Sequence, residues 1–267
     1  MLFYNLQTGE SVNPAETLQT DARFLAWSAD GRSLYLKTDT LGSPQTVRFD
    51  RIQNRLTALD LPETVYDLAA LPDGYVIYSF TKGIGFGSET WLADADGLHP
   101  RPILFEPLEI IAYLRPAPDG SRIAFILMPD SQVPFTIGGL WVMNADGTNA
   151  RFLAEADAGH GYAPAWSPDG TQIAFVVREN PDDPQADLSA GALLSNVYRI
   201  EVRGGALTPV TAFTDAIVET PVWSPDGAGL FFNVFRNGTI QVWVDDAGAL
   251  GPLSEGSACC AVWVPGK

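Results

Sequence analysis

A short turn sequence recurs along this chain and constrains its fold more than any other feature. The stretch Trp-Ser-Pro-Asp-Gly at 166–170 returns, with substitutions, around four further Asp-Gly pairs. The aspartates of the five pairs are separated by 43, 46, 50 and 57 residues, and they are Asp30, Asp73, Asp119, Asp169 and Asp226. A period of this length suits a repeated unit of four short strands.

The segments between the turns have the composition of strands. Aromatic and β-branched residues follow each turn, as in IAFVV at 173–177, and predict a second strand. A third strand then ends in another tight turn, as in LWVMNADG at 140–147, and a short fourth strand such as ARFLAEA at 150–156 completes the unit. Because no long stretch shows a helical period of apolar residues, we predict an all-β chain of four-stranded antiparallel sheets.

The motif WSPDG-x-x-IAF, followed by a third strand that ends in Asp-Gly, resembles the repeat of TolB-like β-propellers, which are relatives of the WD-type repeats. The resemblance covers essentially the whole chain and implies six blades around a central channel. Only five second strands are found, so the closing blade is expected to be shared between the N- and C-terminal strands and to lack one strand. The expected single domain, 1–267, has blades at 21–62, 63–107, 108–156, 157–213 and 214–256, with a closing blade of 257–267 plus 1–20.

The sequence offers few groups for chemistry. All seven tryptophans occupy repeated positions, so we interpret them as blade-packing residues. There is no Gly-x-Ser-x-Gly nucleophile elbow, no His-x-x-x-His pair and no Cys-x-x-Cys pair. The glycine-rich GIGFG at 83–87 opens no helix, which favours a flexible blade loop over a phosphate loop. We therefore predict no catalytic residues, no metal site and no cofactor.

Charge and targeting signals limit the partners. A net charge of −16 argues against a nucleic-acid partner, which needs clustered lysine and arginine. No apolar run reaches the length of a transmembrane segment, and the first residues lack the pattern of a signal peptide. The resemblance to TolB implies a periplasmic or extracellular protein, although the sequence itself assigns no compartment. The adjacent Cys259 and Cys260 fit either two buried thiols or a strained vicinal disulfide.

Counting back from the turn tryptophans places two residues of every repeat at the mouth of the expected channel. These positions vary between repeats, and propellers place recognition on variable positions of a rigid scaffold. The candidate binding residues are Arg23, Tyr66, Asp67, Tyr113, His160, Tyr162, Glu219 and Thr220, of which His160 lies just outside the ring and also fits a solvated loop histidine. The long loop at 178–196 is expected on the same face, as a mobile lid or a contact loop.

Three functions fit these observations. The first is a non-catalytic scaffold resembling TolB that binds a protein or peptide at the channel mouth. The second is a regulatory or sensor propeller severed from a longer protein, which predicts coding sequence before Met1 or after Lys267. The third is a propeller hydrolase or lyase with a metal in the channel, for which the ring positions supply only Asp67 and Glu219 as acidic groups. The incomplete closing blade also predicts an exposed strand edge and self-association.

Overall fold

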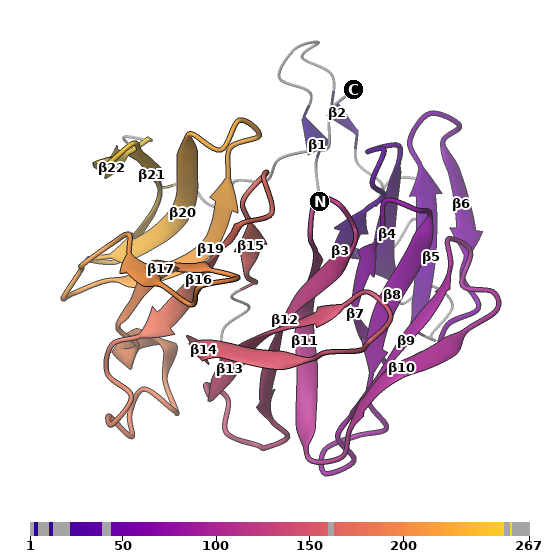
Figure 1. Ribbon diagram of the computed structural model, residues 1–267, viewed down its shortest axis with the longest axis horizontal. Coiled ribbons are helices and arrows are strands. Elements are labelled where there is room, and N and C mark those ends of the chain that lie inside the picture. The colour runs from indigo at the N-terminus through magenta and orange to yellow at the C-terminus, as the bar shows by residue number, and fades with distance from the viewer. Residues whose placement is uncertain are drawn as a thin grey trace. The chain divides into compact units, whose positions relative to one another are not determined.

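The computed structural model describes residues 3–4, 11–12, 22–38, 44–159, 163–253 and 257 of the chain. The regular elements in this part are strands, apart from one short 3-10 turn, η2 (Ala190–Ala192), so the all-β prediction is confirmed there (Figure 1). None of the described residues belong to a helix with the length and hydropathy that crossing a membrane requires. The contacts divide the chain into two compact units, which are described separately: unit 2 contains Gly83–Ser88 and the described residues from Phe105 onward, and unit 1 contains the rest.

Unit 1 is built on two four-stranded sheets whose neighbouring strands follow chain order. The first contains β3 (Ala22–Trp27), β4 (Ser33–Thr38), β5 (Gln45–Asp50) and β6 (Arg55–Ala58). The second contains β7 (Val65–Ala70), β8 (Tyr75–Phe80), β9 (Ser88–Asp94) and β10 (Arg101–Glu106). Leu25 and Tyr35 from the first sheet share a buried cluster with Leu68, Val76 and Tyr78 of the second. The two sheets are therefore packed on each other by apolar burial.

Unit 2 contains three further four-stranded sheets, drawn from magenta to yellow in Figure 1. The first is β11 (Glu109–Pro116), β12 (Arg122–Pro129), β13 (Ile137–Asn144) and β14 (Arg151–Asp157). The second is β15 (Ala165–Trp166), β16 (Gln172–Arg178), β17 (Ser195–Glu201) and β18 (Leu207–Pro209). The third is β19 (Ile217–Trp223), β20 (Gly229–Arg236), β21 (Thr239–Asp246) and β22 (Ala249–Pro252). One buried cluster joins the first sheet to the second, and another joins the second to the third.

The prediction of six blades is wrong, because the described part of the chain forms five four-stranded sheets. Near the N-terminus, β1 (Phe3–Tyr4) and β2 (Ser11–Val12) pair with each other as a two-stranded sheet, and no other described strand pairs with them. The physical reason is that the repeated turns act locally and do not specify how the terminal strands pair, so the repeat itself builds five complete sheets. The rest of the predicted closing blade, with Cys259 and Cys260, lies outside the described residues.

The repeated turn has a specific hydrogen-bonding role. Ser167 Oγ donates to Asp169 Oδ1 at 2.6 Å and accepts from the Gln172 amide at 3.0 Å, while Asp169 also accepts from the Thr171 amide at 3.0 Å. Gly170 has a φ of +68°, a conformation that favours glycine. The serine–aspartate pairs of two other turns repeat this bond, namely Ser28–Asp30 and Ser224–Asp226. The motif is thus a structural turn between the first and second strands.

The turn tryptophans connect neighbouring sheets. The Trp166 indole donates to the Arg115 carbonyl of the preceding sheet at 2.8 Å, and the Trp223 indole donates to the Ala165 carbonyl at 3.2 Å. The Arg122 guanidinium lies 4.9 Å from the centre of the Trp166 ring. The packing role predicted for these tryptophans is therefore confirmed at both positions.

Candidate binding face

Each four-stranded sheet has two chemically different ends. In the β11–β14 sheet, Glu109 pairs with Pro129 where β11 begins and β12 ends, and Pro116 pairs with Ile123 beside the Asp-Gly turn. We call the end with the Glu109–Pro129 pair the loop end, because the connection between the second and third strands begins there. The end with the Pro116–Ile123 pair, beside the Asp-Gly turn, is the turn end. The predicted site residues that the structure describes all lie in the first strands. Arg23, Tyr66 and Asp67 lie near the loop end of their sheets, whereas Tyr113, Glu219 and Thr220 lie in the middle part of their strands.

In unit 1, the predicted residues Arg23, Tyr66 and Asp67 come from two neighbouring sheets. The Arg23 guanidinium donates to the Tyr66 carbonyl at 2.9 Å, and Asp67 is buried opposite Ser79 in the register of β7 and β8. Lys37, which pairs with Arg23 across β3 and β4, donates to the Glu63 carbonyl. Burial and the positive charge of Arg23 lower the pKa of Lys37. Arg23 therefore connects two first strands, and much of its side chain remains exposed.

In unit 2, the predicted residues Tyr113 and Thr220 have a left-handed backbone. Their φ values are +59° and +48°, and both lie within bulges of the first strand, between Ala112 and Arg115 and between Glu219 and Val222. Such a conformation costs an L-residue about 1–2 kcal/mol, and bulges re-aim side chains. The Asn233 side chain donates to Thr220 Oγ1 at 2.8 Å and holds that hydroxyl.

The structure brings together only part of the predicted set. Arg23 contacts Tyr66 in unit 1, and Glu219 is half-buried next to Thr220 in unit 2. His160 and Tyr162 lie outside the described residues. The proposed roles of all eight residues in binding therefore stay predictions.

The long loop after β16 is packed in place at the loop end of its sheet. Arg178 is 1% exposed and pairs with Asp157 at 2.9 Å, a carboxylate that is fully buried at the end of β14. A second bond, of 2.8 Å, reaches Asp187 within the loop. Ala186 and Leu193 of the loop are buried in the unit 2 core. The expectation of a mobile lid therefore does not match a loop that is held by a buried ion pair and by apolar packing.

Two segments at the loop end of unit 2, 83–88 and 105–108, present an exposed apolar cluster that the repeat pattern does not predict. It consists of Ile84, Phe86, Phe105 and Leu108, whose exposed fractions are 64%, 64%, 58% and 74%. Monomeric proteins rarely expose contiguous apolar patches of large side chains unless the patch is a binding surface. The sequence signal for the cluster is the alternation of glycine with Ile84 and Phe86 in GIGFG, which by itself predicts only a flexible loop.

A single carboxylate holds this cluster together. Asp130 Oδ2 accepts hydrogen bonds from the Gly85 amide at 2.7 Å and the Gly87 amide at 2.9 Å, and the Asp130 amide donates to the Leu108 carbonyl at 3.2 Å. At Gly87, φ is +64° and an added Cβ would lie 2.0 Å from the Glu106 carbonyl oxygen. Only glycine allows this close approach, which seats the loop against the segment that carries Phe105 and Leu108.

Comparison with solved structures identifies the arrangement of these sheets. A protein of Agrobacterium tumefaciens assigned as TolB matches with a TM-score of 0.65 and 20% sequence identity, covering 94% of this chain and 86% of the other. The chain has a TolB-like β-propeller fold. No model of a known protein family matches the sequence.

The TolB-like fold is shared by enzymes. An oligogalacturonate lyase in complex with manganese matches with a TM-score of 0.66 and 14% identity, covering 97% of this chain and 73% of the lyase. Among curated proteins, dipeptidyl-peptidase 5 of Porphyromonas gingivalis is 23% identical over 130 residues, which are 48% of this chain but only 18% of the peptidase. At these identities the likeness shows the fold and not the activity.

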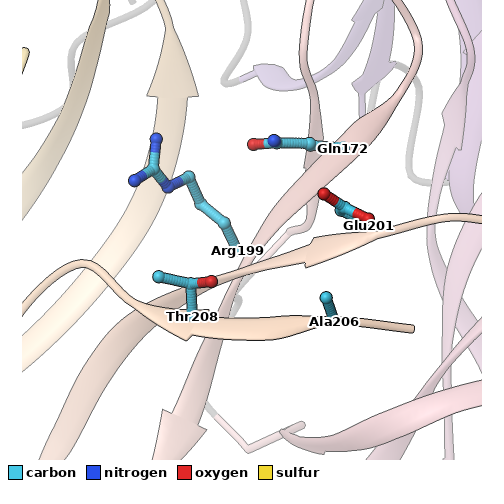
Figure 2. A pocket seen from close by; sticks show the side chains of 5 residues that line it. All are labelled: Gln172, Arg199, Glu201, Ala206 and Thr208. Atoms are coloured by element: carbon cyan, nitrogen blue, oxygen red, sulfur yellow. The ribbon is translucent and has the colours of Figure 1, made fainter. Parts of the chain in front are cut away.

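The described part of the TolB-like chain contains no group of three or more histidine, cysteine, aspartate or glutamate side chains placed to hold a metal ion. One small pocket, of about 100 Å³, lies at the turn end of the β15–β18 sheet and is lined by Gln172, Arg199, Glu201, Ala206 and Thr208. Figure 2 shows the Arg199 side chain extending away from Glu201, and the guanidinium lies 5.9 Å from the centre of the Trp223 ring. Arg199 is thus engaged in packing between sheets, and the space left is too small for a peptide.

Proposed function

We propose that this TolB-like chain is a non-catalytic scaffold that binds a protein or peptide through the apolar cluster at the loop end of unit 2. The observation that carries the proposal is the exposure of four large apolar side chains, 58–74% each, on segments that Asp130 fastens together. First-strand residues of the same unit, Tyr113, Glu219 and Thr220, are proposed as further contacts.

The energetics favour an apolar contact. Burying one such side chain fully is worth about 1.5–3 kcal/mol relative to leaving it in water. The 83–87 loop is already fixed by hydrogen bonds from two of its backbone amides to Asp130, so it loses less conformational entropy on binding than a free loop does. Phe86 and Leu108 are therefore the expected hot spots, where truncation costs most of the affinity.

The charge around the cluster favours a partner with basic residues beside its apolar ones. Glu106, Glu109 and Asp130 border the cluster, and the whole chain carries a net charge of −16. Burial, together with the negative charge of Glu109, raises the pKa of Glu106, so a cationic neighbour would be favourable there. Complementary charge would steer the partner and raise its association rate.

A second candidate is a regulatory or sensor propeller within a longer protein. It is supported by the match of 130 residues to a part of dipeptidyl-peptidase 5. The coding sequence that flanks this chain separates the candidates: an in-frame peptidase domain next to it would favour the regulatory role, and its absence would favour the scaffold.

The scaffold proposal is tested by selecting binders from a random 12-residue peptide library displayed on phage, with the full chain as bait. We expect selected peptides to combine apolar and basic residues, and to bind Phe86→Asp and Leu108→Asp variants about 30-fold or more weakly, which corresponds to the 2 kcal/mol of a hot spot. The matched control is Leu207→Asp, which changes an exposed leucine of β18 in a different sheet of the same unit. Peptides that bind all three folded variants equally would contradict the proposal, as would the failure to select any peptide.

A further inference from the structure

Unit 1 contains a cleft that the proposed function does not use. Its volume is about 440 Å³, within the range of roughly 300–1,000 Å³ that small-molecule sites occupy. It lies at the turn end of the first sheet, between the Ser28–Ser33 turn, the hairpin joining β5 to β6, and the turn that precedes β8. The predicted site residue Arg23 lies at the opposite end of this sheet.

The cleft concentrates arginine in an acidic protein. Arg32, Arg48 and Arg55 line it, although lysine and arginine together number 16 against 32 acidic residues in the whole chain. Arg32 Nε bonds to Asp50 at 3.0 Å, and Arg48 bonds at 2.9 Å to Asp96, which is not part of the lining. Each guanidinium has five N–H donors, so these pairs leave most of the donors unused.

The Arg55 side chain is a cation with no acidic partner among the described residues. It is exposed at the start of β6, where its backbone pairs with Asp50, and no side-chain hydrogen bond or ion pair joins its guanidinium to another residue in the part of the chain that the structure describes. Arg48 differs, because its side chain is only 22% exposed and its position on the central strand β5 is fixed by the sheet. The cleft thus has one half-buried and one exposed guanidinium that are able to bind the same anion from two sides.

The acidic groups of the cleft are already occupied. Asp30 accepts hydrogen bonds from Ser28 Oγ at 2.6 Å and from the Arg32 amide at 3.0 Å. Asp50 accepts from the amides of Ile52 and Gln53, both at 2.9 Å, as well as from Arg32. The two carboxylates are therefore acceptors within turns. The lining contains three guanidinium groups and these two carboxylates, and Asp96, which pairs with Arg48, lies outside the lining. An anion that enters the cleft would meet donors in excess of acceptors.

Two tyrosines, Tyr35 and Tyr75, are among the residues that line the cleft. Tyr35 is 2% exposed, and its hydroxyl donates to the Ala95 carbonyl at 3.4 Å. Tyr75 is 45% exposed at the rim, next to Pro72 and Gly74. A ligand with a carbon skeleton would therefore find the exposed ring of Tyr75 at the rim, beside the guanidinium groups.

We propose that this cleft binds a small organic anion that carries two or more carboxylate or phosphate groups. Planar guanidinium groups hold either kind of oxyanion through paired N–H bonds, and arginine is the preferred residue for such recognition. Arg48 anchors one anionic group inside the cleft, and Arg55 with Arg32 holds the other at its mouth.

The test is calorimetric titration of the full chain with citrate and, separately, with inorganic phosphate at constant ionic strength. Arg55→Ala is expected to weaken citrate binding about ten-fold or more, in line with the loss of charge-assisted bonds. Arg48→Lys keeps the charge but loses the paired donors, so it is expected to weaken binding several-fold without breaking the contact to Asp96. Arg101→Ala removes an equal charge from β10 of the same unit, outside the cleft, and is expected to leave binding unchanged.

The outcomes separate the possibilities. Binding of citrate alone assigns carboxylates as the ligand chemistry, and binding of phosphate alone assigns phosphoryl groups. Absence of binding for both probes at 10 mM, roughly the weakest affinity that a built site would show, overturns the proposal. Equal weakening by Arg55→Ala and Arg101→Ala also overturns it, because general charge attraction would then explain the heat.

Discussion

Replacing Arg178 by leucine removes the cation that holds the long loop of unit 2 to the neighbouring sheet. The side chains of Arg178 and Asp157 are 1% and 0% exposed, and the substitution leaves the Asp157 carboxylate with one hydrogen-bond donor among the described residues, the Gly159 amide at 3.0 Å. A buried carboxylate that loses its ionic partner destabilises a protein by about 3–5 kcal/mol. The bond to Asp187, whose side chain is 45% exposed, is worth about 1 kcal/mol or less.

The assay is thermal unfolding followed by tryptophan fluorescence at neutral pH. For a unit of this size, a loss of about 1 kcal/mol in the free energy of unfolding lowers the Tm by roughly 2–4 °C. Arg178→Leu is therefore expected to lower the Tm by roughly 6–20 °C. Asp187→Asn is the matched control and is expected to lower the Tm by about 4 °C at most.

A double variant separates buried charge from packing. Arg178→Leu with Asp157→Leu replaces the ion pair by apolar side chains, and such a replacement is often neutral or stabilising. It is therefore expected to recover most of the loss. A Tm change below about 2 °C for Arg178→Leu, or a double variant as unstable as the single one, would refute the reasoning.

Three further predictions address the turns and the cluster. Hydrogen bonds from the Ser167 hydroxyl and, second in size, from the Thr171 amide lower the folded-state pKa of Asp169. This carboxylate therefore stabilises the fold above its unfolded pKa of about 4. The Tm deficit of Asp169→Ala is thus expected to be constant from about pH 5 to 8 and to shrink as the pH falls through the folded pKa; a deficit that grows with acid would contradict this. Trp166→Phe leaves the Arg115 carbonyl without its indole donor, and denaturant unfolding is expected to show a loss of about 1–3 kcal/mol. Gly87→Ala is expected to expose the 83–87 loop to limited proteolysis, whereas Gly85→Ala, which has open space for its Cβ, serves as the control; equal cleavage of both would argue against the seating of the loop.

Local signals made the sheets predictable. The Asp-Gly turns act through bonds between residues two to five apart, such as Ser167 to Asp169 and to Gln172, so the motif alone specifies them. Strand type followed from the aromatic and β-branched runs after each turn. The number of blades depended instead on how the two chain ends pair, which the repeat does not encode, and the inference of six was wrong.

Long-range pairing explains what the sequence did not reveal about the site. The apolar cluster depends on Asp130, which lies 45 residues from Gly85, and the packed long loop depends on Asp157, 21 residues from Arg178. Conversely, Arg23 is predicted as a binding residue from its position in the repeat alone, and its guanidinium donates a hydrogen bond to the Tyr66 carbonyl. Repeat position therefore indicates the end of a sheet, and contacts between sheets decide which side chains remain available there.

The central claim is that recognition occurs at the loop end of unit 2 through Ile84, Phe86, Phe105 and Leu108. Hydrogen–deuterium exchange of the full chain, with and without a saturating selected peptide, tests it most directly. We expect the peptide to slow exchange in 83–88 and 105–111, while exchange in the Ser167–Gln172 turn stays unchanged. Protection confined to that turn or to the arginine cleft of unit 1, with none in 83–88, would contradict the account.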